Sequence, residues 1–149
     1  MENITIRPAG ISDIPVLLDL LYQLGRPKPR DDFELDSFRN LVKNYVTNSD
    51  KMIFVATLND VEIIGMVSIV LLPRLNNSSL EMYIPELIVI ENFQNHGIGK
   101  KIMKHCIQFA KEKKCHRIRL ESGIQRKNSH DFYKNLEFEQ SSLSFSKII

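Results

Sequence analysis

The residues best suited to chemistry stand where an apolar run leads into two closely spaced glycines. The run Leu87–Ile90 is typical of a buried strand, and Gly97 and Gly99 open a long stretch with helical periodicity. The first N–H groups of a helix have no partner within the helix and lie at the positive end of its dipole. Glycines let a phosphate approach that backbone closely. The junction therefore predicts a site for a phosphorylated ligand.

Two common nucleotide-binding motifs do not fit this junction. The dinucleotide fingerprint needs a third glycine where Ile102 stands. The Walker A loop needs a glycine where Gln94 stands and a Ser or Thr where Lys101 stands. What remains is the spacing Gln94-x-x-Gly97-x-Gly99.

This spacing resembles the Q/R-x-x-G-x-G/A pyrophosphate-binding motif of the GCN5-related N-acetyltransferases, the GNAT family. The segment Asn128–Phe138 looks like that family's N…FY…GF element, and the order of elements matches along nearly the whole chain. Two positions depart from the pattern. Glu137 replaces the glycine usual before the late Phe, so we expect the turn there to be made differently, and Gln94 stands where Arg is more common. The resemblance implies a single N-acetyltransferase domain over residues 1–149, of the α/β class, with a central mixed sheet and helices on both faces.

The resemblance also implies acetyl-CoA as co-substrate, with no metal. The loop and the first helical turn would wrap the pyrophosphate, through Gln94, Asn95, His96, Gly97, Ile98, Gly99 and Lys100. The backbone of the preceding strand would pair with the pantetheine arm like an added strand, and one N–H would polarise the thioester carbonyl, at Ile88, Val89 and Ile90. Asn128 would contact the pantetheine or order a water, or else cap a helix.

Two residues are candidates for proton transfer. A leaving thiolate needs a proton, and by the resemblance Tyr133 is the candidate general acid, the alternative being a core aromatic. An attacking amine must lose a proton, and by the same resemblance Glu86, at the mouth of the cofactor strand, is the candidate general base, the alternative being a solvated charge. Glu81 and Glu121 are weaker candidates for the base.

The histidines and cysteines are weaker candidates for catalytic or binding roles. His96 would expose its ring near the phosphates or have no role, while His105 and His116 are expected at the surface. Two cysteines cannot build a disulfide framework or a four-ligand zinc site unaided. Cys106 lies on an apolar stripe and is expected in the core, so transfer through an acyl-enzyme is disfavoured.

The elements that position these residues follow from hydrophobic periodicity. Helices are expected after Ser12, over the apolar positions from Leu35 to Val46, over Gly97–Lys114 and over Asn128–Leu136. Strands are expected over Ile4–Arg7, Met52–Leu58, Val61–Leu72, Met82–Ile90, Arg117–Glu121 and Ser142–Ile149, with a tight turn at Asn59-Asp60. The Leu87–Ile90 strand, the long helix and the Arg117–Glu121 strand form a βαβ unit, which makes parallel pairs.

Composition bounds the remaining possibilities. The chain has 149 residues, 43% hydrophobic and 26% charged, which is typical of one globular domain. No run is long enough to span a membrane and residues 1–20 lack a signal-peptide core, so we expect a cytoplasmic protein that does not bind membranes. The net charge is only +2, yet the segment from Gln94 to Arg119 holds eight Lys/Arg and one acid. No aromatic residue is interleaved with the basic cluster Lys111–Arg119 at the end of this segment, so CoA phosphates are favoured over a nucleic acid as the partner.

These observations predict direct acetyl transfer from acetyl-CoA to an amine of a small molecule. The alternatives are a protein or peptide amine as acceptor and a non-catalytic acyl-CoA sensor, and a homodimer is left open. The acceptor pocket is expected between the Gly25–Phe33 loop and the final strands. Four acids gather at that loop and the following helix start, either favouring a cationic acceptor or only serving the helix: Asp31, Asp32, Glu34 and Asp36.

Overall fold

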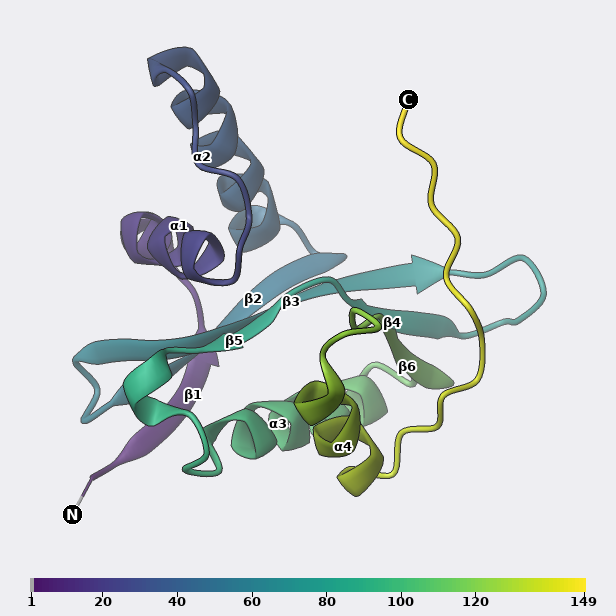
Figure 1. Ribbon diagram of the computed structural model, residues 1–149. Coiled ribbons are helices and arrows are strands. Elements are labelled where there is room, and N and C mark those ends of the chain that lie inside the picture. Colours follow the sequence, from purple (N-terminus) through teal and green to yellow (C-terminus); the bar gives the residue numbers. More distant parts are fainter. Residues whose placement is uncertain (1) are drawn as a thin grey trace. The chain divides into compact units, whose positions relative to one another are not determined.

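The computed structural model describes residues 2–149, and these divide into two compact units. The first unit ends at Arg119 and the second is Leu120–Ile149. Figure 1 shows the helices and strands of both. Each unit is described by itself below.

The first unit is built on a six-stranded sheet (Figure 1). Five strands follow the order β1-β2-β3-β4-β6, and a sixth, β5, pairs with β3 off that path. Their bounds are β1 Ile4–Pro8, β2 Lys51–Leu58, β3 Glu62–Pro73, β4 Leu80–Ile84, β5 Leu87–Val89 and β6 Arg117–Leu120. The turn between β2 and β3 places Asn59 and Asp60 at φ 53° and 60°, as the predicted tight hairpin requires.

The sheet is mixed, as predicted. The pairs β1–β2, β2–β3, β3–β4 and β3–β5 are antiparallel. By contrast, the His116 N–H donates to the Leu80 carbonyl where β6 and β4 both begin. Further along both strands, the Arg119 guanidinium lies 4.5 Å from the centre of the Tyr83 ring. The starts of the two strands are therefore aligned, and β4 and β6 run in the same direction.

Helices cover both faces of this sheet (Figure 1). Neighbouring side chains of β2 point to opposite faces, so apolar residues on both faces need a helix to pack against. Ile53 and Val55 point into a core shared with α1 (Ile14–Gln23) and α2 (Asp32–Thr47). Phe54 points the other way, where its ring packs edge-on against His105 and Phe109 of α3 (Ile98–Glu112). Two short 3₁₀ turns complete the unit, η1 Ile11–Asp13 and η2 Glu91–Phe93.

The strand expected over Met82–Ile90 is divided into β4 and β5. Tyr83 lies opposite Val70 and Leu87 opposite Val67, so four steps along one strand match three along β3. One extra residue is therefore accommodated in a bulge around Pro85, a residue that cannot donate a ladder hydrogen bond. The expected pairing of Leu87–Ile90 with Arg117–Glu121 is wrong, because β6 lies next to β4 and not next to β5.

The second unit contains α4 (Lys127–Asn135) and the residues after it. Arg126 occupies the N-cap position, so Asn128 lies inside the helix and the interpretation of it as the cap is wrong. Glu137 adopts φ 67°, the left-handed conformation that glycine favours. The expectation of a different turn is therefore also wrong, since Glu137 makes a glycine-type turn itself.

The final strand expected over Ser142–Ile149 does not form. This segment alternates apolar and polar residues, but a strand also needs a neighbour for its backbone hydrogen bonds. The described residues provide no paired strand there, and the side chains of Leu143, Phe145, Ile148 and Ile149 are exposed.

Candidate active site

The junction between β5 and α3 is held by its own backbone and by one amide side chain. The Gln94 side chain donates from Nε2 to the Val89 carbonyl at 2.9 Å, which ties the loop back to the end of β5. Asn95 and Gly97 then take left-handed conformations, at φ 63° and 79°. These two residues reverse the chain and let α3 begin at Ile98.

The start of α3 presents free backbone donors. The Lys101 N–H bonds to the Gly97 carbonyl, the first bond of the helical ladder. The N–H groups of the three residues before Lys101 precede that ladder and lie at the positive end of the helix dipole. Ile98 is buried and anchors this first turn, whereas Gln94–Gly97 and Lys100 are exposed. The junction is therefore an exposed loop, tied to β5 by Gln94, that leads into a helix start whose first N–H groups precede the helical ladder, which suits an anion.

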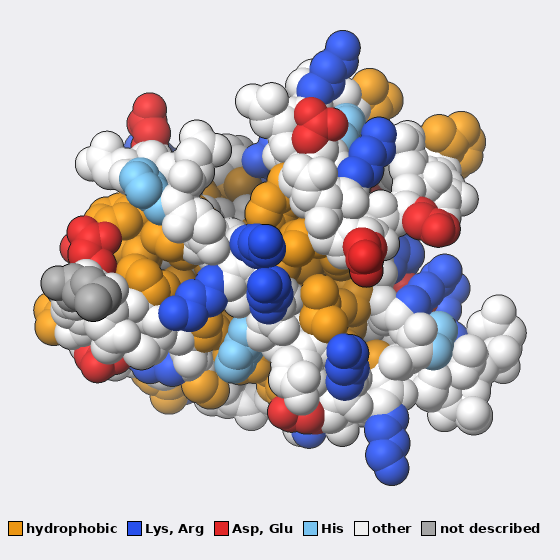
Figure 2. All heavy atoms as spheres, turned by 90° about the horizontal axis from the view of Figure 1, so that it is seen from below, with side chains coloured by type: hydrophobic (Ala, Val, Ile, Leu, Met, Phe, Trp, Pro, Cys, Tyr) orange, Lys and Arg blue, Asp and Glu red, His pale blue; other side chains and the backbone are white. Residues whose placement is uncertain are grey.

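The surroundings of the junction are basic. Figure 2 looks onto the α3 side of the sheet and shows Lys and Arg side chains across that face. The Lys101 ammonium donates to the Ile4 carbonyl, so part of this charge also holds α3 against β1. Half of the cations in the basic segment predicted from the sequence lie on the helix that begins at the junction: Lys100, Lys101, Lys104 and Lys111.

The backbone of β5 has one edge bound to β3 and the other turned away. The Ser68 N–H bonds to the Glu86 carbonyl and the Ile90 N–H bonds to the Ile64 carbonyl, each at 2.9 Å. In an antiparallel ladder the bonded positions alternate, so Ile88 also faces β3. Leu87 and Val89 therefore direct their N–H and C=O groups to the opposite edge. Of the three strand positions predicted to meet a ligand, Val89 is the one with its backbone on that edge.

Gly65 is a part of this site that sequence reasoning missed. A Cβ on Gly65 would lie 3.0 Å from the Ile88 carbonyl oxygen and 3.2 Å from the Ile102 side chain. The missing side chain lets β5 and α3 both pack closely onto β3. The available signal was a glycine inside a run of β-formers, which often marks a close backbone approach.

Glu86 lies on the opposite face of the sheet from α3, among polar groups. Its carboxylate forms an ion pair with Arg26 at 2.8 Å and accepts a hydrogen bond from the Ser68 hydroxyl at 2.7 Å. Ser68 belongs to the same face of β3 as Met66, which packs in the core under α1 and α2. Both oxygens of Glu86 thus have a partner, and the carboxylate is 19% exposed.

Two tyrosines lie near Glu86 on the same face of the sheet, the face opposite α3. Tyr45 of α2 has a raised pKa, because burial and then the charges of Glu86 and Tyr83 disfavour its ionised form. The Lys51 ammonium lies 5.6 Å from the centre of the Tyr45 ring. Tyr45 is therefore close to both Glu86 and Tyr83, and we call the row of Arg26, Glu86, Tyr45 and Tyr83 the polar strip.

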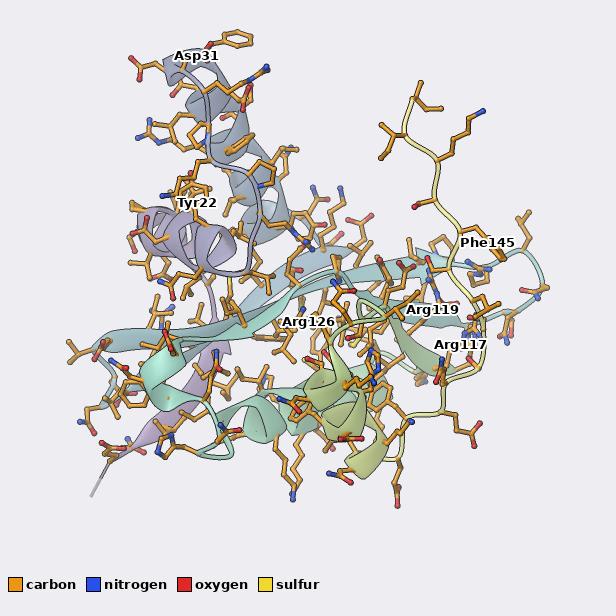
Figure 3. The ribbon with its side chains drawn as sticks, in the orientation of Figure 1. Tyr22, Asp31, Arg117, Arg119, Arg126 and Phe145 are labelled. Carbon is orange, nitrogen blue, oxygen red and sulfur yellow. The ribbon has the colours of Figure 1, made fainter. Side chains whose placement is uncertain are left out.

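The polar strip ends at a buried carboxylate surrounded by arginines. Glu81 is fully buried, and its oxygens bind Arg119 at 2.5 Å and Arg117 at 3.0 Å, with Arg74 at 3.7 Å. Burial raises the pKa of this carboxyl, but the hydrogen bonds from Arg119 and Arg117 outweigh burial and bring the pKa below its ordinary value. Figure 3 shows Arg117 and Arg119 extending beside one another from β6. We call Arg74, Arg117 and Arg119 the arginine cluster.

The acidic residues at the start of α2 are used locally. The Asp31 side chain accepts a hydrogen bond from the Glu34 N–H at 2.8 Å and so caps the helix. Glu34 pairs with Arg30, and Asp36 pairs with Arg39. Capping and neighbouring cations thus account for three of the four acids.

In the second unit, Tyr133 lies on α4 within an aromatic group. Its ring packs edge-on against Phe132 and Phe138, with centroids 5.1 Å and 5.8 Å away. The carbonyl of Tyr133 also accepts the Phe138 N–H that closes the turn at Glu137. Glu121, the other weak candidate for a base, accepts a hydrogen bond from the Ser144 hydroxyl.

Cys106, His105 and His116 have structural contacts and are not placed as catalytic groups. Burial raises the pKa of the Cys106 thiol to about 12, so this residue is a core side chain, as predicted. His105 packs on Phe54, and the ring of His116 shares a hydrogen bond with the Ser79 hydroxyl.

Within residues 2–149, no group of three His, Cys, Asp or Glu side chains is placed to hold a metal ion. Nor does this described part contain a helix with the length and apolar character needed to cross a membrane.

Solved structures share this fold over almost their whole length. A transcriptional regulator from Bacillus halodurans C-125 superposes with a TM-score of 0.84 at 23% identity, covering 99% of this chain and 100% of the other. Glucosamine-6-phosphate N-acetyltransferase from Arabidopsis thaliana gives a TM-score of 0.78 at 23% identity, covering 98% of each chain. The aminoglycoside N-acetyltransferase AAC(6')-Iy, solved in complex with CoA, gives 0.82 at 18% identity, covering 100% of this chain and 96% of the other.

Sequence comparison identifies the family more directly. A search of curated proteins gave no match. The family model described as "Acetyltransferase (GNAT) family", however, matches residues 18–138, which include the β5–α3 junction and α4. The chain therefore belongs to the GNAT family of acetyltransferases, enzymes that transfer acyl groups.

Proposed function

We propose that this protein is an acetyl-CoA-dependent N-acetyltransferase that passes acetyl directly to an amine of a small molecule, with residues 1–149 acting as one catalytic domain. The observation that carries the proposal is the β5–α3 junction. It combines the edge of β5 that faces away from β3, a loop fixed by the hydrogen bond from Gln94 to the Val89 carbonyl, and a helix N-terminus rich in donors. Family membership supports the choice of cofactor.

The cofactor would follow the junction from strand to helix. Leu87 would offer its outward N–H and C=O groups to the amide-bearing pantetheine arm, in the manner of an added strand, and Val89 would offer only its N–H, because its carbonyl already accepts the Gln94 amide. The N–H groups of Ile98, Gly99 and Lys100 would then bind the pyrophosphate, and His96 and Asn95 would line the loop around it. Gln94 would act by holding the loop against Val89, since its amide is already bonded there.

The reaction needs a proton to leave the amine and a proton to reach the departing thiolate. Glu86 is the proposed general base. Because Arg26 and Ser68 already bind its oxygens, it would take the proton through a water molecule or after Arg26 moves. Tyr133 is the proposed general acid, supported by the resemblance of its Asn128–Phe138 segment to the family's element. The N–H of Val89 would polarise the thioester carbonyl during attack.

A thiol-release assay with acetyl-CoA tests this function. The purified protein should release CoA in proportion to added amine and yield an N-acetylated product that mass spectrometry identifies. The panel would contain small amines, lysine-bearing peptides and no amine. Release with peptides alone would show a protein acceptor instead. Saturable acetyl-CoA binding without release for any amine would show a sensor.

A further inference from the structure

Glu86 is held in place through its backbone and one of its two carboxylate oxygens. The Ser68 hydroxyl donates to Oε1 of Glu86 at 2.7 Å, and the oxygen of the same hydroxyl accepts the Glu86 N–H at 3.0 Å. The Ser68 N–H also donates to the Glu86 carbonyl at 2.9 Å. Ser68 is 3% exposed, so water has little access to these three bonds. One oxygen of the carboxylate is therefore fixed against β3.

The other oxygen of Glu86 is held by a side chain that can leave. Oε2 pairs with the Arg26 guanidinium at 2.8 Å, and among the residues that the structure describes Arg26 is the cation paired with Glu86. The further hydrogen bond of this guanidinium, to the Pro85 carbonyl, is long, at 3.3 Å. The Arg26 side chain is 49% exposed, and ion pairs with such exposure contribute little to stability. Another cation can therefore replace Arg26 on Oε2 at small cost.

The backbone of Arg26 is fixed independently of its side chain. α1 ends in a Schellman motif, in which the Arg26 N–H donates to the Leu21 carbonyl at 3.0 Å. The Gly25 N–H donates to the Tyr22 carbonyl, also at 3.0 Å, and Gly25 adopts the left-handed φ of 101° that this motif requires. Release of Oε2 therefore needs the rotation of one side chain and does not require the loop after α1 to move.

We propose that Oε2 of Glu86 binds the protonated amine of the acceptor, and that Arg26 occupies this position until the acceptor replaces it. The inference rests on the proposed function for the identity of the ligand as the acceptor. The guanidinium of Arg26 is already bound there, so the position accepts a cation. The acceptor class is an alkylamine, which is protonated at neutral pH like the lysine side chain, and not an arylamine, which is neutral there.

The proposal gives the removal of Arg26 an unusual sign. Removing a residue that binds the acceptor weakens acceptor binding, whereas removing a residue that occupies the acceptor's position strengthens it. A purely structural tie between the end of α1 and Glu86 would do neither, because its loss would lower stability without strengthening the binding of a cation. The direction of the change in affinity therefore distinguishes competition from both alternatives.

Small cations test this competition in the protein without cofactor. The probes are butylammonium and methylguanidinium, with 1-butanol as a neutral molecule of similar size, and binding is followed by NMR at the amides of Ser68 and Glu86. We expect Arg26→Ala to bind both cations about two- to fivefold more tightly than the wild type, the range expected when a partly exposed ion pair no longer competes. Arg26→Lys keeps a cation and should restore part of the competition. The affinity for 1-butanol should not change.

Two further variants assign the effect to Glu86. Arg7→Ala is the matched control, because Arg7 pairs with Asp13 at 2.7 Å. These two side chains are 44% and 12% exposed, close to the 49% and 19% of the Arg26–Glu86 pair, and the variant should leave the affinity for the probes unchanged. Adding Glu86→Gln to Arg26→Ala should remove the gain. Unchanged or weaker cation binding in Arg26→Ala, an equal gain in Arg7→Ala or for 1-butanol, or a gain that survives Glu86→Gln would overturn the proposal.

Turnover with acetyl-CoA separates this proposal from the proposed function. If cations bind more tightly to Arg26→Ala but no amine is acetylated, the cation site stands and the acetyl-transfer proposal fails. If amines are acetylated but Arg26→Ala does not strengthen cation binding, acetyl transfer stands and the exchange at Glu86 is rejected. If both hold, the KM for butylamine should fall in Arg26→Ala by the same factor as the dissociation constant. A tighter cation site with an unchanged KM would show that the site does not hold the acceptor, and would also overturn the proposal.

Discussion

The β5–α3 junction and the polar strip with its arginine cluster are built in contrasting ways. The junction is one continuous stretch, from Leu87 to Lys100, and its donors are mainly backbone groups. The polar strip and cluster are assembled by side chains from the loops after α1, β3 and β4, from α2, and from the strands β4 and β6. A continuous stretch leaves a motif that can be recognised, whereas an assembled surface leaves none. The comparison explains why the sequence indicates a phosphate site at the junction but does not indicate the polar strip or the arginine cluster.

The largest effect should follow from removing the charge at the centre of the arginine cluster. Glu81→Gln leaves three arginines around a neutral amide in a buried position, and we expect unfolding to become easier by about 3 kcal/mol, as when one partner of a buried ion pair is lost. Chemical denaturation monitored by circular dichroism measures this change. Asp36→Asn is the control, since Asp36 is 70% exposed and its pair with Arg39 should contribute less than about 1 kcal/mol.

The same variant should change the pH dependence of stability. The pKa of Glu81 is lowered in the folded protein, so its contribution is complete above the ordinary carboxyl pKa and is lost as the pH falls through the folded value. The difference in unfolding free energy between the wild-type protein and Glu81→Gln should therefore shrink as the pH is lowered below about 4.5. A difference that grows on acidification would contradict the assignment.

The next largest effect concerns Tyr133. Tyr133→Phe keeps the ring and its contacts with Phe132 and Phe138 but removes the hydroxyl group that would donate the proton. We expect kcat to fall by roughly 10²-fold, within the usual range for a general acid, with acetyl-CoA affinity little changed. Steady-state kinetics and a binding titration measure the two quantities. Turnover near that of the wild type would identify Tyr133 as a packing residue only.

A charge placed in the junction should weaken cofactor binding without unfolding the protein. Gly99→Glu adds a bulky anion at the N-terminus of α3, where we propose the pyrophosphate binds. Affinity for acetyl-CoA should drop at least tenfold, about 1.4 kcal/mol, in a calorimetric titration. Gln108→Glu adds the same charge at an exposed position of α3 and should leave the affinity nearly unchanged. Equal affinities for the two variants would break the assignment of the phosphate site.

The smallest effect should come from the turn after α4. Glu137 holds φ 67°, which costs an L-residue about 1 kcal/mol or more and costs glycine little. Glu137→Gly should therefore stabilise the protein by up to about 1 kcal/mol, less the entropy that glycine adds to the unfolded chain. A thermal melt would detect this increase. The control Glu139→Gly, at an exposed position for which no positive φ is recorded, should give no increase.

Sequence reasoning succeeded where the determinants are local. The hairpin at Asn59 and Asp60 and the start of α3 near Gly97 follow from residue types and spacing alone. Sequence reasoning failed where a strand forms or pairs only through contact with a segment far away in the sequence. Whether Ser142–Ile149 forms a strand depends on a neighbouring strand, and the pairing of β6 with β4 joins segments that are far apart in the sequence.

The candidate site divides in the same way. The motif around Gln94 predicted a backbone anion site, but which groups of β5 face outward required the register against β3. The partners of Glu86 and Glu81 were not visible, because Arg26 and Arg117 are separated from them by 60 and 36 residues.

An amide-resolved NMR titration with acetyl-CoA tests the central claim most directly. We predict saturable shifts that are largest at the N–H groups of Leu87 and Val89 on β5 and of residues 97–100 at the start of α3, with small shifts at Ile88 and Ile90, which face β3. Large shifts confined to other elements, or no saturable shift at any amide of the junction, would contradict the claim that this junction binds the cofactor.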